Sequence, residues 1–185
     1  AQHAADSVAL QAQSNAAIAY DFLAAQGVPV TACDFTYALA EDIGGDTLAP
    51  GIHCFPSSAF ITGDLTLDAQ GDPSAVWVFN IESSLITAPA SSVGIINGGQ
   101  ACNVYWRVGS AATLDTTTAF QGNIFALADI DVLTGATVTG RLFARTAAVD
   151  MDDNIINVAT CAPVGEPGHI IVEKQTLPDG ALEQF

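Results

Sequence analysis

The stretch that decides the fold is residues 103–158, NVYWRVGSAATLDTTTAFQGNIFALADIDVLTGATVTGRLFARTAAVDMDDNIINV, which contains a diverged repeat of about 18 residues. Each unit has a first apolar run and a second short run; these are Val104–Val108 with Ala112–Asp115, Ile124–Ala128 with Ile130–Leu133, and Leu142–Thr146 with Val149–Asp152. A small polar corner follows and ends on a large apolar residue, Phe120, Val138 or Ile155. Strands repeated at this period predict the stacked coils of a β-solenoid, whose equivalent residues form columns about 4.8 Å apart.

Earlier segments fit the same frame with more insertion. Leu65–Asp68 and Ser84–Thr87 match the second run, Val76–Phe79 matches the first, and Asn97–Cys102 is a loop between coils. We count about four coils up to Val158, and arrays of this kind need three or more. Short strands with Gly and Asp turns also suit a β-sandwich. The solenoid is favoured because the columns match in residue type as well as in polarity.

The N-terminal segment from Ala4 to Gln26 lacks Pro and Gly and is rich in Ala, which favours a helix. Gly27 and Pro29 then form a stop signal. The apolar stripe expected to face the solenoid is Val8, Ala12, Ala16, Ala19 and Leu23, widened by Ile18 and Phe22. The segment has no Lys or Arg, which counts against a helix on an anionic membrane, and no run reaches the about 18 apolar residues that span a bilayer.

Composition limits the partners and the compartment. The net charge is −16, with 4 basic and 20 acidic residues, so nucleic acid and a membrane are not expected as partners. The 4 Cys predict two disulfides outside the cytosol, in a secreted or cell-surface protein. The expected pairs are Cys33 with Cys54 and Cys102 with Cys161. CxxC spacing is absent, so neither a zinc site nor another metal site is predicted.

Catalytic arrangements are hard to find. His3, His53 and His169 are scattered, and none stands in a recognised nucleophile motif. Asp131 and Asp150 fall in one predicted column, and Asp115 and Asp152 fall in the next. Stacked carboxylates could bind a cation or cleave a polysaccharide, although charges on a solvated face are the commoner explanation. We therefore predict no enzyme and no cofactor, and keep a β-helical carbohydrate-binding or polysaccharide-cleaving domain as the alternative function.

Small hydroxyl and amide side chains recur after each second run. The predicted site residues are Thr87, Ser92, Thr116, Thr118, Thr134, Thr137 and Asn154. Because Thr carries a methyl and a hydroxyl, a flat array of Thr can hold ordered water, which bridges with little loss compared with direct hydrogen bonds. Ladders of Thr also arise because β-branched residues suit strands. The pattern alone does not separate the two explanations.

Three long stretches, residues 65–79, 96–106 and 122–141, resemble the ice-binding protein family of cold-adapted bacteria, fungi and algae. With the Ala-rich helix, the resemblance covers roughly residues 1–161. It implies a mainly β fold, a right-handed discontinuous β-solenoid of triangular section with one long helix packed along its flank. It also implies adsorption to ice through one flat face. The family's motif of Thr, Ala or Gly, any residue, and Thr or Asn matches Thr134–Thr137, and more loosely Thr116–Ala119 and Thr87–Ser92, whereas Asp153 departs from it.

The resemblance also sets the expected domains. Residues 1–162 form the ice-binding domain, with the helix at about 4–26 and coils at about 46–160, and lack the strands that family members place before the helix. Residues 163–185 form a linker and the start of an extracellular β-sandwich repeat. The expected partners are an ice surface and ordered water, giving thermal hysteresis and inhibition of recrystallisation, in an ice adhesin as one option. We expect a monomer, or an oligomer if the absent strands are supplied in trans.

Overall fold

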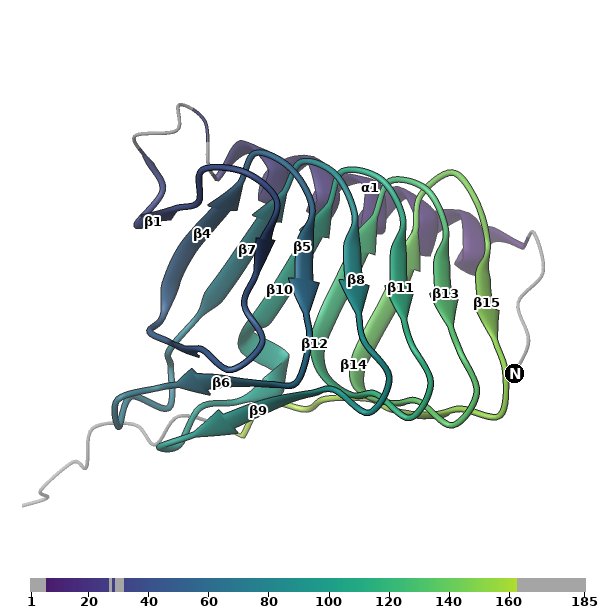
Figure 1. Cartoon of the computed structure of the whole chain (residues 1–185). Coiled ribbons are helices and arrows are strands. Elements are labelled where there is room, and N and C mark those ends of the chain that lie inside the picture. Colours follow the sequence, from purple (N-terminus) through teal and green to yellow (C-terminus); the bar gives the residue numbers. More distant parts are fainter. Residues whose placement is uncertain (1–5, 27, 29–31, 163–185) are drawn as a thin grey trace, which may run out of the picture.

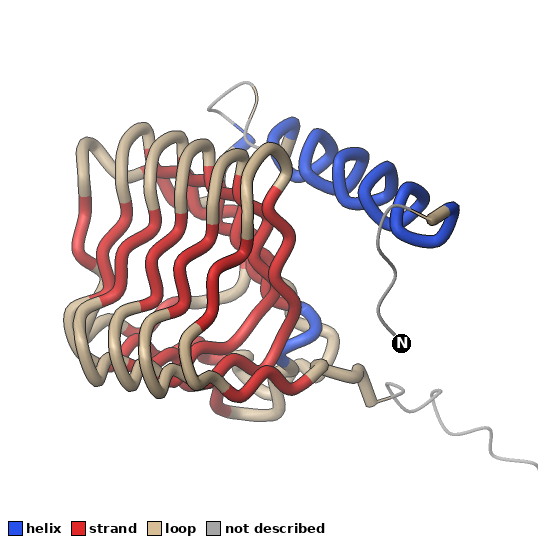
Figure 2. The backbone as a smooth tube through the Cα atoms, turned by 90° about the vertical axis from the view of Figure 1, so that its right-hand side faces the viewer, coloured by secondary structure: helices blue, strands red, loops and turns tan. Residues whose placement is uncertain are grey.

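The computed structural model describes residues 6–26, 28 and 32–162. The chain winds into a β-solenoid with three faces, and one helix lies alongside it (Figures 1 and 2). We call the faces the helix face, the front face and the lower face, in the order in which each coil visits them. Neighbouring coils are joined by parallel strand pairs in every pairing of the described residues, so the β-sandwich alternative is wrong.

The strands of each face follow in chain order. The helix face contains β1 (Phe35–Thr36), β4 (Gly51–Phe55), β7 (Trp77–Ile81), β10 (Val104–Val108) and the second halves of β12 (Ala119–Ala126) and β14 (Thr137–Ala144). The front face contains β2 (Glu41–Asp42), β5 (Ala59–Ile61), β8 (Leu85–Thr87), β11 (Ala112–Leu114), β13 (Ile130–Val132) and β15 (Val149–Met151). The lower face contains β3 (Thr47–Leu48), β6 (Asp64–Asp68), β9 (Ser92–Ile96), the first halves of β12 and β14, and β16 (Ile155–Asn157). A 3-10 turn, η2 (Ala101–Asn103), precedes β10.

The front face shows that there are six coils, because its sheet has 6 strands. Coil 3 is β7, β8 and β9; coil 4 is β10, β11 and the first half of β12; coil 5 runs from there through β13 into β14. Coil 6 is the remainder of β14 with β15 and β16. The first coil begins at Phe35, earlier than the expected start near residue 46.

Side-chain alternation along the strands builds the core. Inward residues of successive coils stand in register, as Phe79, Trp106 and Ile124 do across β7, β10 and β12. The rings of Phe79 and Trp106 stack with centroids 3.7 Å apart, and both side chains are fully buried. Burying aromatic side chains of this size is a large favourable contribution to folding. The columns of apolar residues therefore hold the coils in one register.

The third strand of each coil was missed by the sequence reasoning. Leu65–Asp68 belongs to β6 on the lower face and is not a second run. The expected corner residues Phe120 and Val138 lie in lower-face strands and point inward. Ile155 does not share their column, because it pairs with Thr137 and is 60% exposed. The turn between β15 and β16 is one residue shorter than the turn between β13 and β14. The inward position of β16 therefore falls on Ile156, which pairs with Val138.

Helix α1 (Ser7–Ala25) begins at Asp6, whose carboxylate accepts a hydrogen bond of 2.9 Å from the backbone of Ala9. Its contact with the solenoid rests on Tyr20 and Leu23, which pack against Val78 and Phe125. The N-terminal half of the helix extends beyond the last coil (Figure 2). No helix among the described residues is long and apolar enough to cross a membrane.

The predicted apolar stripe of this helix is wrong in part, since Val8, Ile18 and Phe22 are 56%, 66% and 65% exposed. Tyr20, which is not in the predicted stripe, faces the sheet instead, where the guanidinium groups of Arg107 and Arg145 lie 5.0 and 5.2 Å from the centre of its ring.

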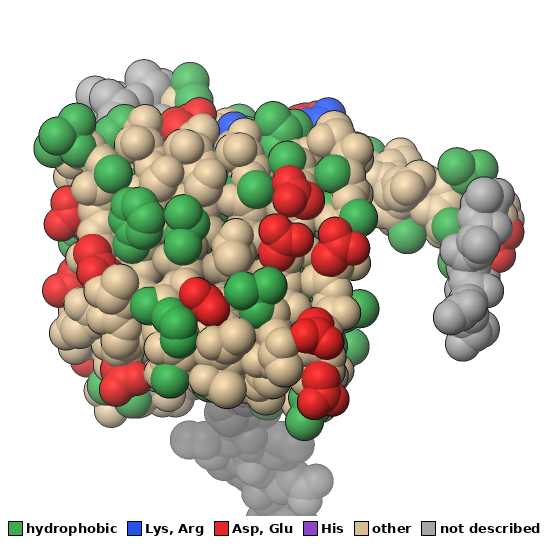
Figure 3. All heavy atoms as spheres, turned by 45° about the vertical axis from the view of Figure 1, so that its right-hand side comes forward, with side chains coloured by type: hydrophobic (Ala, Val, Ile, Leu, Met, Phe, Trp, Pro, Cys, Tyr) green, Lys and Arg blue, Asp and Glu red, His purple; other side chains and the backbone are tan. Residues whose placement is uncertain are grey.

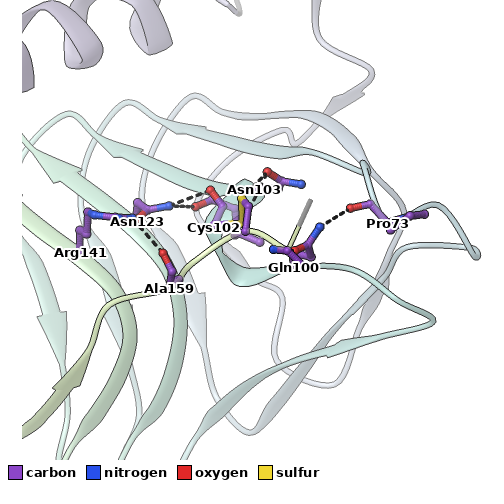
Figure 4. Close-up of a disulfide and its surroundings, with 10 residues drawn as sticks. Pro73, Gln100, Cys102, Asn103, Asn123, Arg141 and Ala159 are labelled. Carbon is purple, nitrogen blue, oxygen red and sulfur yellow. Dashed lines mark hydrogen bonds between the residues drawn. A yellow bond between two sulfur atoms is a disulfide. The ribbon is translucent and has the colours of Figure 1, made fainter. Parts of the chain in front are cut away.

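Both expected disulfides are present. Cys33 is bonded to Cys54 and Cys102 to Cys161, with Cα atoms 6.0 and 5.6 Å apart. The second bond ties the chain after β16 to η2 (Figure 4).

Hydrogen bonds around the disulfide between Cys102 and Cys161 also hold the chain after β16 and the loop before η2. Arg141 donates to the carbonyl of Ala159 at 3.3 Å, and the side chain of Gln100 donates to the carbonyl of Pro73 at 2.8 Å (Figure 4). The side-chain oxygen of Gln100 also accepts a bond of 2.6 Å from the backbone of Ala162. The proposed linker and sandwich repeat at 163–185 lie outside the described residues.

Candidate functional site

The turn from the front face to the lower face repeats in coils 3, 4 and 5 and places two residues at its tip each time, of which at least one is exposed. We call these six residues the corner surface: Pro89, Ala90, Thr116, Thr117, Thr134 and Gly135. Successive turns are joined by backbone hydrogen bonds. Ala90 N–H donates to Thr116 at 2.9 Å, and Thr117 N–H donates to Thr134 at 3.0 Å. These bonds align the residues of successive coils at the strand spacing.

One residue of each turn has a left-handed backbone. The φ angles are 57° at Ala90, 58° at Thr117 and 74° at Gly135. Left-handed backbone is easy for Gly and rare for a β-branched residue such as Thr. The same turn geometry is therefore kept in coil 4 although its sequence does not favour it.

The structure separates the seven predicted site residues by exposure. Thr134 is exposed, whereas Ser92, Thr116, Thr137 and Asn154 are half-buried. Ser92 and Thr137 point outward from the first position of their lower-face strands, beside the corner surface. Thr116 and Thr134 therefore belong to the corner surface, and Ser92 and Thr137 border it. Together these residues follow one strip along the solenoid.

Thr87 and Thr118 do not belong to the surface, since each is only 1% exposed. Thr87 is the inward residue at the end of β8, in the position that Leu114 and Val132 occupy in the next two coils. Thr118 takes the inward position of its turn, as the buried Ala136 does in coil 5. Because side chains alternate with a period of two, an alignment shifted by one residue exchanges the inner and outer faces.

Several of the predicted polar groups are used within the protein. Thr134 donates its hydroxyl proton to the carboxylate of Asp152. Ser92 donates to Asp64 at 2.6 Å. The amide of Asn154 donates to the carbonyls of Leu133 and Ala136 at 2.8 and 3.2 Å, so Asn154 closes the last turn.

Thr117 is the exposed hydroxyl that the sequence reasoning missed. Its hydroxyl donates to the carbonyl of Thr116 at 2.7 Å, which leaves the methyl group on the surface. The signal in the sequence was the run Thr116–Thr118, of which only the first and third residues had been chosen.

The front face beside this corner changes character along the solenoid. Its outward column reads Asp42, Phe60, Ile86, Thr113, Asp131 and Asp150 from the first coil to the last. Apolar side chains gather toward one end of the face, and acidic side chains gather toward the end where the helix projects (Figure 3). The uncharged part of this column therefore covers coils 2 to 4 and meets the Thr residues of the corner.

The stacked carboxylates behind the alternative function are placed as predicted but form no cleft. Asp131 and Asp150 pair across β13 and β15 and point outward from an open face. A groove of about 630 Å³ lies elsewhere, between α1 and the end of β14, and it contains neither Asp. Among the described residues, no three His, Cys, Asp or Glu side chains come together as metal ligands would.

Parallel coils with an uncharged strip repeated at the strand spacing define the chain as a β-solenoid with a regular exterior surface. The chain belongs to the Ice-binding-like family, which it matches over residues 1–157. It is 46% identical over 155 residues to an ice-binding protein of Nostoc sp. (strain HG1), covering 83% of this chain and 55% of that protein. It is 41% identical over 151 residues to ice-binding protein 1 of Shewanella frigidimarina (strain NCIMB 400), covering 80% and 17%.

Among solved structures, the ice-binding protein of Antarctomyces psychrotrophicus matches with a TM-score of 0.79 at 36% identity. The match covers 84% of this chain and 73% of that protein. The expected fold class, a β-solenoid with a flanking helix, is thus confirmed. The aligned part of this chain corresponds to about half of the Nostoc protein (55%) and less than a fifth of the Shewanella protein (17%). The comparisons give no support to the carbohydrate alternative.

Proposed function

We propose that this chain is a non-enzymatic ice-binding domain that adsorbs to ice through the corner surface and the uncharged front face beside it. The observation that carries the proposal is the membership of the family together with the regular, uncharged strip of Thr, Ala and Gly in coils 3 to 5. Adsorbed molecules would pin the ice front. The expected activities are thermal hysteresis and inhibition of ice recrystallisation.

The chemistry of the strip suits this task. The methyl groups of Thr116, Thr117 and Ala90 cannot form hydrogen bonds with water, so they would not disturb an ice-like arrangement around them, while neighbouring hydroxyl and backbone groups would hold first-shell waters. Ordered bridging waters are nearly as favourable as direct hydrogen bonds. A rigid strip has already lost its side-chain freedom, so adsorption has less entropy to overcome. Charges would instead organise water around themselves, which is why the acidic columns are excluded from the proposed site.

The protein is proposed to act outside the cytosol, secreted or at the cell surface, since its two disulfides persist in oxidising surroundings. Its proposed partners are ice and ordered water, and it is proposed to act as a monomer. The strongly negative charge disfavours nucleic acid and anionic membranes. A second proposed use is anchoring a cell to ice, as part of an ice adhesin.

Thermal hysteresis of the Thr134→Tyr variant tests the site. A bulky ring on the strip should hold the neighbouring residues away from the crystal and remove most of the activity. Its unfolding free energy should change by about 0.5 kcal/mol or less, as is usual for exposed substitutions. Thr36→Tyr is the matched control, because Thr36 is exposed on the first strand of another face.

Asp131→Asn should leave the activity close to that of the unchanged protein. The carbohydrate alternative predicts the reverse pattern. Hysteresis that survives Thr134→Tyr but disappears in Asp131→Asn would overturn the assignment of the site.

A further inference from the structure

Three hydroxyl groups are buried beneath the corner surface, between coils 3 and 4. Thr87, Ser91 and Thr118 are each 1% exposed. In the neighbouring coils the equivalent inward positions hold apolar residues, such as Val132 and Ala136 in coil 5. Burying a hydroxyl is unfavourable unless it is hydrogen-bonded, so its presence at this one step needs an explanation.

The hydroxyls form a relay that crosses between the two coils. The backbone N–H of Asp115 donates to the hydroxyl of Thr87 at 2.8 Å, and that oxygen lies 2.9 Å from the hydroxyl of Thr118. Thr118 donates in turn to the carbonyl of Ala88 at 3.3 Å. Since each hydroxyl has one proton, Thr87 must be the donor to Thr118. The hydroxyl of Ser91 lies 3.4 Å from the same Thr118 oxygen, so all three hydroxyls have a partner.

This relay replaces a backbone bond found at three other steps. At these steps the first N–H of the turn donates to a main-chain carbonyl of the preceding coil. The bonds are Ala88 to Ile61 at 2.9 Å between coils 2 and 3, Leu133 to Leu114 at 2.9 Å between coils 4 and 5, and Asp152 to Val132 at 3.2 Å between coils 5 and 6. Between coils 3 and 4 the N–H of Asp115 bonds the hydroxyl of Thr87 instead, and between coils 1 and 2 the N–H of Thr62 bonds the carboxylate of Asp42 at 3.0 Å. Of these two side-chain bonds, only the one between coils 3 and 4 belongs to a turn of the corner surface, among the described residues. Thr87 and Thr118 therefore join the two turns there from beneath, in addition to the backbone bond from Ala90 to Thr116.

We propose that Thr87 and Thr118 are positioning residues of the ice-binding surface. Thr118 follows Thr117 directly, and its backbone N–H also bonds the carbonyl of Asp115 at 3.2 Å. It is thus held from beneath and from within its own turn. The relay keeps Thr116 and Thr117 level with Pro89 and Ala90, so that coils 3 and 4 present one plane. This inference rests on the proposed function of the same surface.

Thermal hysteresis of Thr118→Val and Thr118→Ser tests the relay. Val has nearly the shape of Thr but cannot continue the hydrogen bonds, so Thr118→Val should lower hysteresis by about fivefold or more at equal concentration. Ser keeps the hydroxyl and should restore most of the activity. Thr87→Val should behave like Thr118→Val, because it breaks the same relay.

Val138→Ala is the control for stability. Val138 is buried beneath the lower face and takes no part in the relay, yet its truncation should weaken the fold. Melting is followed for every variant, and hysteresis is compared at temperatures where all are folded. If Val138→Ala loses as much activity as Thr118→Val, the loss follows stability and the positioning role is wrong.

The two proposals can fail separately. If the protein without any substitution shows no thermal hysteresis, both the proposed function and the relay are wrong. An active protein that loses hysteresis in Thr134→Tyr but keeps it in Thr118→Val overturns the relay alone.

Discussion

Thr117 has a left-handed backbone with a φ of 58°, a conformation that costs a non-Gly residue of order 1–3 kcal/mol. Gly135 occupies the same place in the next coil without this cost. Strain kept at an exposed position points to a use for the side chain. We expect Thr117→Gly to leave thermal stability unchanged or raised, and to lower thermal hysteresis because a methyl group of the strip is lost.

A thermal melt and a hysteresis measurement on Thr117→Gly check this together. Gln70→Gly is the control, since Gln70 is exposed with a φ of 56° in a turn outside the corner surface, so this change relieves the same backbone strain without altering the proposed site. Lower stability with full activity in Thr117→Gly would mean that the side chain serves the turn and not the surface.

His53 predicts a pH dependence of stability. It is fully buried between the rings of Phe35 and Phe79, with centroids 4.5 and 5.0 Å away. Its Nε2 bonds the carbonyl of Ala49 at 3.0 Å, and its Nδ1 lies 3.2 Å from the hydroxyl of Tyr37. Burial lowers the pKa of His53, although the hydrogen bond to Ala49 and the charge of Asp34 oppose this shift.

Because this pKa is lowered, the unfolded chain binds the proton more readily than the folded protein. The stabilising contribution is fully present above the ordinary pKa of about 6.5 and is lost as the pH falls below it. The melting temperature should therefore drop between about pH 7 and pH 5. His53→Phe, which keeps the ring stack, should flatten this part of the profile even if it melts lower throughout. An equal slope in both proteins would assign the titration to other groups.

Individual residues were the hardest level to predict from the sequence. The choice of Thr134 depended on a local motif, and the structure places that residue on the surface. Thr87 and Thr118 are Thr residues in the same runs, yet they are buried. A hydrophobicity pattern cannot separate them, since their hydroxyls are bonded inside the protein, and a shift of one residue reverses the face.

Among the elements, helix α1 shows what the sequence could and could not predict. Its existence followed from Ala content and its stop signal, because propensity summed over many residues is informative. Its rotation did not, because a stripe of small residues gives a weak signal and Tyr20 is drawn to Arg107 and Arg145 from distant strands. The lower-face strands were not predicted because each begins directly after a sharp turn. On the sequence alone, their first residues were assigned to the corner that follows the second run.

Tyr20→Ala should detach this helix from the sheet. The ring is 5% exposed and its removal also ends both contacts with arginine, so the cost should be about 3 kcal/mol. Amide exchange along Ser7–Ala25 should accelerate more than exchange in the strands. Ile18→Ala is the control: Ile18 is 66% exposed and should change stability by about 0.5 kcal/mol or less. If Tyr20→Ala and Ile18→Ala lowered the stability equally, Ile18 would contribute to the contact with the sheet, as the sequence predicted.

For the whole molecule, stacking explains both the regular surface and its limits. The strands of each coil pair only with those of neighbouring coils, so stability is close to a sum of nearest-neighbour terms. The disulfide between Cys102 and Cys161 adds one link across several coils. The corner surface lies in coils 3 to 5, with coils on both sides. A repeat period visible in the sequence was therefore enough to predict the stack, whereas the number of coils depended on irregular early strands that the period does not show.

Leu114 and Met151 make the effect of lying at the end of the stack measurable. Both occupy the last position of a front-face strand, in one inward column through Val132. Leu114 is fully buried in coil 4, whereas Met151 in coil 6 is 59% exposed because no further coil covers it. Leu114→Ala should cost about 2–5 kcal/mol, and Met151→Ala should cost less than about 1 kcal/mol. Chemical denaturation of both variants gives the two values.

Equal costs would mean that the last coil is packed as tightly as the middle of the stack, and that its exposed column is covered in solution. The expected difference instead predicts that opening starts at β15 and β16. Amides of these strands should then exchange faster than those of β11 and β13. The corner surface lies in coils 3 to 5 and does not include coil 6. Met151→Ala should therefore keep full thermal hysteresis at any temperature where the protein is folded.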